Sequence, residues 1–103
     1  MKIKTSELTG AALDWAVARC EGGVGENQLL GAWYAPSTDW AQGGPIIERE
    51  NICLWSEGYD WEAKINSSGQ WLAEWDEYPL IAAMRCYVSS KLGDEVEIPE
   101  ELK

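Results

Sequence analysis

The sequence predicts an α+β fold, in which a small antiparallel sheet of two to three strands packs against two main helices, at about 9–21 and 78–92, and a short helix at about 45–50. Apolar residues recur at helical spacing in the two long segments, whereas the middle of the chain shows the period-two alternation of strands. Neither an internal repeat nor a linker divides the 103 residues. We therefore expect a single domain, 1–103, with an acidic C-terminal tail at 94–103.

The first helix is expected to begin after Thr9, because threonine is a good N-cap residue. Leu8 and Leu13 have the spacing of a hydrophobic staple across this start. Four glycines within 22–34 end the helix and predict a loop there. Trp15 falls on the side of the helix opposite its apolar stripe, so its side chain is expected to project to the surface.

The short helix follows a segment rich in capping residues. With Asp39 as N-cap, Gln42 falls at the third helical position, which is a variant of the capping box. Gly43 and Gly44 are expected to interrupt any helix that starts there, because glycine is a poor helix former. Pro45 suits the first turn of a helix and is expected to restart it.

The middle of the chain is expected to form strands joined by turns. Residues 52–55 are rich in strand-forming types, and 59–65 alternate cleanly between an apolar and a charged face. The sequence Asn-Ser-Ser-Gly at 66–69 is typical of a hairpin connection. Residues 70–75 are expected to form a third strand, although their alternation is weaker.

Both ends of the chain carry weaker strand patterns. Residues 1–5 alternate lysines with an isoleucine, which fits a short strand or an extended arm. The tail carries five acids between 94 and 101, and Val96 and Ile98 alternate with them, so part of the tail is expected to dock as an edge strand. An acidic tail can also engage a basic partner, but most such tails are simply solvated.

Residues 79–93 give the clearest helix signal. The segment opens with proline, which fits a first helical turn, and closes on glycine, which accepts the conformation beyond a helix end. Leu80 and Met84 mark an apolar face, on which the sheet is expected to pack. Ala82 and Cys86 mark a stripe of small residues, where another helix or a loop is expected to approach closely.

Composition excludes several classes of partner. The net charge is −10 and the eight basic residues are scattered, which argues against direct binding to nucleic acid or to an anionic membrane. The chain has no run of about 18 apolar residues that would predict a membrane-spanning helix, and its first residues lack the apolar core of a secretory signal. With three widely spaced cysteines and no histidine, we expect free thiols in a reducing cytoplasm, no metal site and no cofactor.

Three blocks of the chain resemble the phage NinX-like family of small proteins of unknown function: LTGAALDWAVARCEG, STDWAQGGPIIEREN and PLIAAMRCYVSSKLGDEVEIPEEL. The resemblance covers 2–102 and is loose across 51–77; the order of these blocks is also similar to phage α-β-α sandwich domains. It implies a phage or prophage origin, expression in the cytoplasm of a bacterial host and an accessory role. The family carries no established activity, so the resemblance transfers no catalytic residue.

Two features suggest a binding surface. Hydroxyl and carboxylate side chains flanked by aromatics at 34–40 can hold a small polar ligand, although the same residues can simply cap a helix. Seven tryptophans without a phenylalanine favour at least one exposed aromatic cluster for a protein interface or self-association; the alternative is that most lie half-buried under loops. The candidate residues are Trp15, Tyr34, Ser37, Thr38, Asp39, Trp40, Glu48 and Arg49.

Glu48 and Arg49 enter this set because an arginine between two glutamates can hold an anionic group, although such runs are more often solvated ion pairs. Catalysis is not expected. The chain has no histidine and no phosphate-binding or nucleophile-elbow motif. In the strand region, the carboxylate pairs Asp60 with Glu62 and Glu74 with Asp76 also fit a solvated strand face.

The sequence therefore favours a non-enzymatic phage accessory protein that binds an unidentified protein of the host or the phage. Two alternatives remain open. One is an acidic DNA-mimic decoy, because 18 acids on a small fold can present phosphate-like charge. The other is a module for a small polar ligand, centred on the loop at 37–40.

Overall fold

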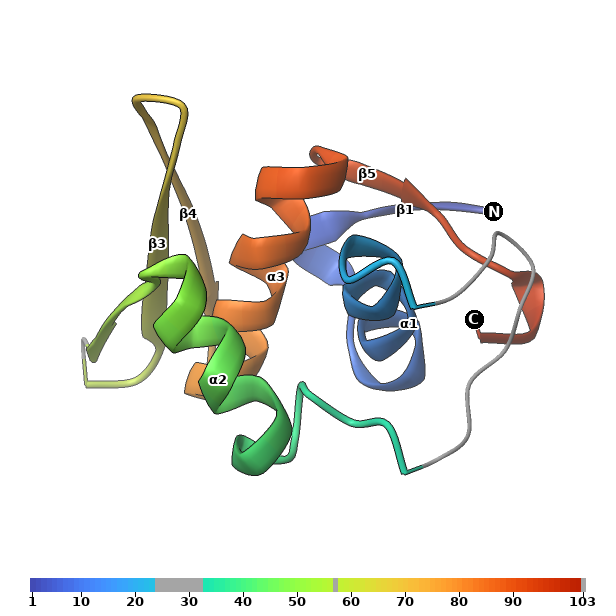
Figure 1. Ribbon diagram of the computed structural model, residues 1–103, viewed down its shortest axis with the longest axis horizontal. Helices are drawn as coiled ribbons and strands as arrows, with labels where there is room; N and C mark the ends of the chain where they lie inside the picture. Colours follow the sequence, from blue (N-terminus) through green and yellow to red (C-terminus); the bar gives the residue numbers. More distant parts are fainter. Residues whose placement is uncertain (24–32, 57, 103) are drawn as a thin grey trace.

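The computed structural model describes residues 1–23, 33–56 and 58–102. Its elements are three helices, two short 3₁₀ turns and five strands (Figure 1). In chain order they are β1 (Lys2–Lys4), a 3₁₀ turn (Thr5–Glu7), α1 (Gly10–Cys20), α2 (Trp40–Glu50), β2 (Cys53–Ser56), β3 (Trp61–Ser67), β4 (Gln70–Asp76), α3 (Pro79–Leu92), β5 (Glu95–Glu97) and a 3₁₀ turn (Glu100–Leu102). The predicted α+β fold is confirmed; most of the loop predicted at 22–34 lies outside the described residues.

Strands β2, β3 and β4 form an antiparallel sheet in that order. The β3–β4 hairpin turns at Ser68 and Gly69, whose φ angles are 53° and 87°. Two consecutive positive φ angles are the geometry of the tight hairpin turn whose twist matches the flanking strands. The hairpin predicted from Asn-Ser-Ser-Gly and the third strand are therefore both confirmed.

The two ends of the chain pair with each other in a separate two-stranded antiparallel sheet. The register is Lys2 with Glu97, Ile3 with Val96 and Lys4 with Glu95. Each acid of β5 thus lies opposite a lysine of β1, while Val96 between them is buried. The predicted edge strand in the acidic tail exists, and its partner is the N-terminal strand.

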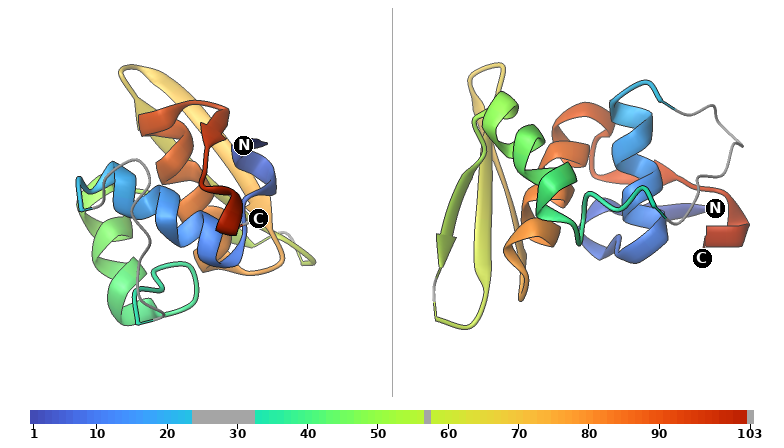
Figure 2. Two further views of the ribbon diagram at one scale, coloured as in Figure 1. Left: turned by 90° about the vertical axis from the view of Figure 1, so that its right-hand side faces the viewer. Right: turned by 60° about the horizontal axis from the view of Figure 1, so that its bottom comes forward.

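Helix α3 lies between the three-stranded sheet and α1, with α2 along its side (Figures 1 and 2). Residues Ala82 to Val88 of α3 are all buried, so the helix is enclosed on every side. The thiol of Cys86 contacts the carbonyl oxygens of Ala63 at 3.5 Å and Leu72 at 3.4 Å. Cys86 of the small-residue stripe therefore faces the sheet, whereas a helix or a loop was predicted there.

Helix α2 begins at Trp40, five residues before the predicted start, and Gly43 does not interrupt it. A Cβ atom at Gly43 would lie 2.4 Å from the carbonyl oxygen of Pro36 and 2.6 Å from Cδ1 of Leu80. Glycine is thus required by close packing against α3. The predicted N-cap is confirmed, because Asp39 Oδ1 accepts a hydrogen bond of 3.0 Å from the Ala41 N–H.

Among the described residues, no helix is both long enough and apolar enough to cross a membrane.

Candidate functional site

The three-stranded sheet has one covered and one uncovered face. Ala63 and Ile65 of β3 are 0% and 3% exposed and belong to the core beneath the sheet. All three helices lie on this side, as the right-hand view of Figure 2 shows. Successive residues of a strand point to opposite faces, so Glu62 and Lys64 belong to the other side. No described helix covers that side.

Strand register identifies the members of this uncovered surface, which we call the outer face. Residues directly opposite each other in paired strands share a face of the sheet. Glu62 lies opposite both Trp55 and Trp75, and Asn66 lies opposite Trp71. The outer face comprises Cys53, Trp55, Glu62, Lys64, Asn66, Trp71, Ala73 and Trp75.

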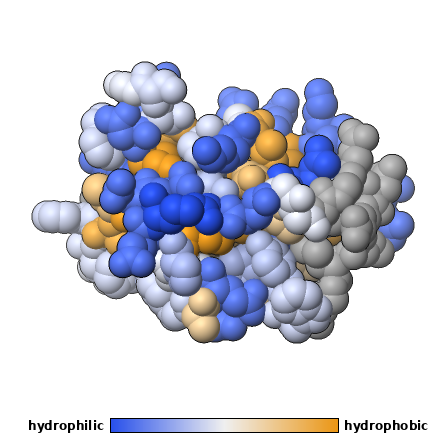
Figure 3. Space-filling model, viewed as in Figure 1, coloured by the Kyte–Doolittle hydropathy of each residue, from blue (hydrophilic) through white to orange (hydrophobic). Residues whose placement is uncertain are grey.

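Three tryptophans on this face are open to solvent. Trp55 is 64%, Trp71 58% and Trp75 49% exposed. On the face of the molecule shown in Figure 3, the surface is mostly hydrophilic and the aliphatic residues emerge in small patches. Trp33, Trp40, Tyr59 and Tyr78 are also exposed, but they lie outside the three strands. Large exposed apolar groups gathered on one face are typical of interaction surfaces.

Glu62 lies between two indoles on this face. Its side chain is only 14% exposed, although it belongs to the uncovered side of the sheet. Its carboxylate oxygen Oε1 lies 3.9 Å from Nζ of Lys64, at the outer limit of an ion pair. A hollow of about 300 Å³ beside them is lined by Cys53, Leu54, Trp55, Glu62 and Lys64.

Arg85 of α3 fixes the strand that carries Trp75. This arginine is 7% exposed, and its Nε donates to the carbonyl oxygen of Leu8 at 2.8 Å. Its Nη1 donates to the carbonyl oxygen of Trp75 at 2.9 Å and to Oδ1 of Asp76 at 3.0 Å. The end of β4 is thereby tied to the central helix, and the backbone beneath the outer face is held in place.

The predicted surface position of Trp15 is wrong. Its side chain is 2% exposed, and the guanidinium of Arg19 lies 5.7 Å from the centre of its ring. The residues from Ala12 to Ala18 of α1 are all buried. The helix is therefore enclosed on more than one side, and Trp15 belongs to the core.

Ser37 is also buried, at 2% exposure. Its backbone N–H donates to Oδ1 of Asp14 in α1 at 2.8 Å. Burial raises the pKa of the Asp14 carboxyl, and its contacts with Ser37 oppose that rise. This pair joins the loop before α2 to α1. It was not predicted from the sequence, where the only signal is an acid placed among the apolar residues of α1.

Of the other residues predicted at 34–40, some support the fold and some are exposed on the surface. Asp39 caps α2, and its Oδ2 accepts from Gln42 Nε2 at 2.9 Å. The predicted capping box does not form, because the Asp39 N–H donates to the carbonyl oxygen of Ala35 and Gln42 Oε1 accepts from the Ala35 N–H. Tyr34 is half-buried. Thr38 and Trp40, which is 53% exposed, line a hollow of about 340 Å³ together with Tyr78 at the start of α3.

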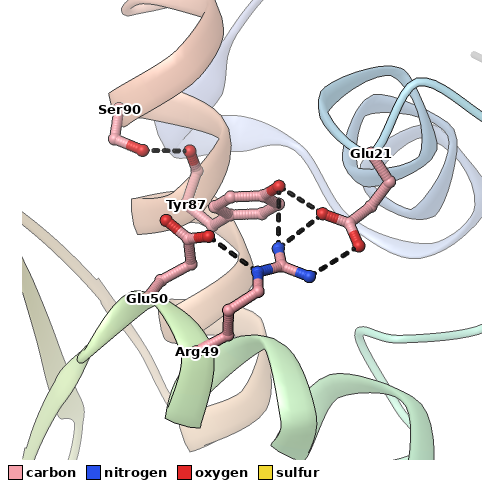
Figure 4. A network of polar contacts seen from close by, with 5 residues as sticks. All are labelled: Glu21, Arg49, Glu50, Tyr87 and Ser90. Atoms are coloured by element: carbon pink, nitrogen blue, oxygen red, sulfur yellow. Dashed lines mark hydrogen bonds and ion pairs between the residues drawn. The ribbon is translucent and has the colours of Figure 1, made fainter.

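Arg49 joins three helices (Figure 4). Its Nη1 and Nη2 donate to the two carboxylate oxygens of Glu21, at the end of α1, at 3.0 and 2.6 Å. Its Nε donates to Glu50 at 2.8 Å, and its Nη2 also donates to the Tyr87 hydroxyl of α3 at 3.1 Å. This guanidinium therefore already holds carboxylates of its own chain, while Glu48 beside it lies exposed on α2.

The hydrogen bonds around Arg49 shift the pKa values of the groups that take part in them. Hydrogen bonds from Arg49 lower the pKa of Glu21, which also accepts a hydrogen bond from the Tyr87 hydroxyl. Burial and this bond to Glu21 raise the pKa of Tyr87. Burial likewise raises the pKa of the neighbouring Cys20 thiol to about 12.

No group of three or more potential ligands among the described residues is arranged to hold a metal ion.

The sequence pointed to exposed tryptophans but did not assemble the outer face. Trp71 and Trp75 lie four residues apart on β4, and Trp55 lies on another strand. Counting residue pairs outward from the predicted hairpin turn places Trp71 opposite Asn66 and Trp75 opposite Glu62. This pairing is the feature of the sequence from which the members of the outer face on β3 and β4 could have been found.

Comparison with known proteins agrees with the resemblance seen in the sequence. The family model described as "Bacteriophage P22, NinX" matches residues 4–91. No curated protein matches the chain. The matched segment runs from β1 to the last turn of α3 and includes the whole outer face. The chain belongs to the phage P22 NinX family.

Proposed function

We propose that this phage protein is a non-enzymatic accessory protein that binds another protein, of the host or the phage, through the outer face. The observation that supports this proposal most strongly is the set of three exposed tryptophans on one uncovered side of the sheet. Tryptophan combines a large apolar ring with a polar N–H, and it is enriched among the residues that dominate protein interfaces.

The available area fits such a role. A fully enclosed tryptophan buries about 150–250 Å², and a standard interface takes about 800 Å² from each partner. With half to two-thirds of each ring exposed, the three indoles offer on the order of 350 Å². The sheet also holds them on a fixed backbone, so little ordering is needed when a partner binds.

The carboxylates give little support to a catalytic role. Glu62 belongs to the outer face, whereas Glu74 lies opposite Ala63 and belongs to the covered face. The sheet therefore separates Asp60 and Glu62 from Glu74 and Asp76, and Asp76 is itself paired with Arg85. A general acid and base acting on one substrate must both reach it.

Charge placement also weakens the DNA-mimic alternative. That hypothesis requires rows of carboxylates on one surface. The acids of β5 instead face lysines of β1 across the strand pair, and Glu21 and Glu50 are paired with Arg49.

A ligand module remains a second candidate, supported by the hollow between Thr38, Trp40 and Tyr78. A thermal-shift screen of metabolites and nucleotides against the wild type and Trp40→Ala tests it.

Affinity capture from phage-infected cells tests the main proposal. The bait is compared with a Trp55→Ser/Trp75→Ser variant and with Tyr59→Ser, a control that removes an aromatic residue that is 94% exposed and precedes β3. We expect one protein to be captured by the wild type and the control and lost with the double variant. Equal capture by all three folded baits would show that the partner binds elsewhere.

A further inference from the structure

Trp55, Glu62 and Trp75 form a row whose side chains have the chemistry of a cation-binding site, which we call the cation seat. Neighbouring strands lie about 4.8 Å apart, so the backbone positions of Trp55 and Trp75 flank that of Glu62 at about 5 Å on each side. An aromatic face attracts a cation within about 6 Å of the ring centre. A positive group above Glu62 would therefore meet a carboxylate and two indoles together.

Resting on the proposed function, we propose that this row receives an arginine side chain of the partner protein. A guanidinium is planar, stacks on aromatic rings and is more weakly hydrated than an ammonium group. It can also donate two hydrogen bonds to one carboxylate. In the part of the chain that the structure describes, the cation paired with Glu62 is Lys64, whose Nζ stands 3.9 Å away and whose side chain is 50% exposed, so it can move aside.

The charges around the outer face favour binding of a cation at the end that carries Glu62. Asp60 precedes β3 and Glu77 follows β4, and both are exposed beside the row that contains Glu62. The other end of the sheet, at the hairpin, carries Asn66 opposite Trp71. One aromatic position thus has acidic neighbours and the other has a neutral amide, which makes Trp71 an internal control.

A second copy of the chain is a poor occupant of this seat. Two chains that each carry a net charge of −10 repel one another. The chain has three arginines of its own: Arg19 lies against Trp15, Arg49 is paired with Glu21 and Glu50, and Arg85 is buried. Each is engaged within its own chain, so the arginine comes from a different protein.

The test follows the indole N–H signals of the ¹⁵N-labelled full chain by NMR. The probe is Nα-acetyl-argininamide, and its neutral isostere Nα-acetyl-citrullinamide is added at matched ionic strength. We expect saturable shifts of the Trp55 and Trp75 signals with the arginine compound alone, and much smaller shifts of Trp71. Glu62→Gln should weaken the binding about threefold, in line with the value of an exposed ion pair.

The inference is overturned if the citrulline compound shifts the same signals equally, or if Trp71 responds as strongly as Trp55 and Trp75. Because the Glu62 side chain is only 14% exposed, the fold of Glu62→Gln is checked first by its amide spectrum, which should match that of the wild type away from residue 62. The two proposals can fail separately. If affinity capture of a partner depends on Trp55 and Trp75 but the NMR signals do not shift with the arginine compound, the cation seat is refuted and the protein-binding role stands. An arginine response without face-dependent capture would leave a cation-binding row but refute both the protein-binding role and a partner protein as the source of the arginine.

Discussion

Trp75 lies directly opposite Glu62 in the register of β3 and β4, on the side of the sheet that no described helix covers. The same glutamate has Trp55 as its neighbour on β2. Exposed strand faces usually carry polar side chains, because apolar ones gain nothing from contact with water. We propose that a carboxylate between two indoles at such a position serves recognition of a partner.

Gly43 and Gly44 should respond in opposite directions to replacement by alanine. A Cβ at Gly43 meets Pro36 and Leu80 below 3 Å, whereas a Cβ at Gly44 has nothing within 4 Å. We expect Gly43→Ala to lower the free energy of unfolding by about 1–3 kcal/mol through overpacking. Gly44→Ala should raise it by about 0.5–1 kcal/mol, because alanine is the better helix former. Urea denaturation of both variants measures the difference, and equal effects would contradict the close contact between α2 and α3.

A glutamate should be tolerated at Cys53 and not at Cys86. Cys86 is fully buried against β3 and β4, and an unpaired carboxylate there would be desolvated. We expect Cys86→Glu to cost more than about 3 kcal/mol, a large part of the stability of a small domain. Cys53 is exposed opposite Lys64, so Cys53→Glu should change the stability by less than about 0.5 kcal/mol. Thermal melts followed by circular dichroism compare the two, and a Cys86→Glu protein that melts like the wild type would refute the packing of α3 on the sheet.

Glu21 should make the protein more sensitive to acid. Hydrogen bonds from Arg49 lower its pKa in the folded state below the ordinary value of 4.5. A depressed carboxyl pKa contributes stability above the unfolded-state pKa, and that contribution is lost as the pH falls through the folded-state pKa. Asp14 acts in the opposite sense, because burial raises its pKa and its stabilising effect is lost as the pH rises.

The measurement is the melting temperature of the wild type and of Glu21→Gln between pH 7 and pH 3. The gap between the two should be widest near neutral pH and should narrow below about pH 4.5, as Glu21 of the wild type takes up its proton. Glu48→Gln, which alters an exposed acid of α2, serves as the control and should leave the profile of the wild type unchanged. A gap that stays constant down to pH 3 would show that Glu21 is not held as a carboxylate by Arg49.

The three thiols should differ in reactivity. Burial raises the pKa of both Cys20 and Cys86 to about 12, so almost none of either is a thiolate at pH 8. Cys53 is exposed on the outer face. We expect iodoacetamide to alkylate Cys53 first in the native protein, with all three residues reacting once urea unfolds the chain. Peptide mass mapping identifies the modified residue, and faster native labelling of Cys86 would contradict its burial beneath the sheet.

Local signals were enough to predict most of the fold. The proline at residue 79 and the Asn-Ser-Ser-Gly turn act through neighbouring residues, and α1, α3 and the hairpin were predicted within one or two residues. Thr9 precedes α1 as predicted, but its side chain makes no capping hydrogen bond. Gly43 could not be interpreted in this way, because its role depends on Leu80 of another helix. Glycine alone predicts a helix break, and only the tertiary contact explains why the helix continues.

The candidate site was harder to predict for the same reason. Trp15 looked exposed when its helix was assumed to have one buried face, but α1 is buried on several. The outer face combines Trp55, Glu62 and Trp75 from three different strands, so it exists only in the register of the sheet. Composition predicted an exposed tryptophan cluster, and the structure identifies its members.

Site-specific photo-crosslinking in infected cells tests the protein-binding role of the outer face most directly. The photoreactive residue p-benzoylphenylalanine replaces Trp71 on the outer face or, as a control, Glu48 on the exposed side of α2. Our account predicts a discrete crosslinked protein from position 71 and none from position 48. A crosslinked partner from position 48, with none from position 71, would contradict the assignment of the outer face as the binding surface.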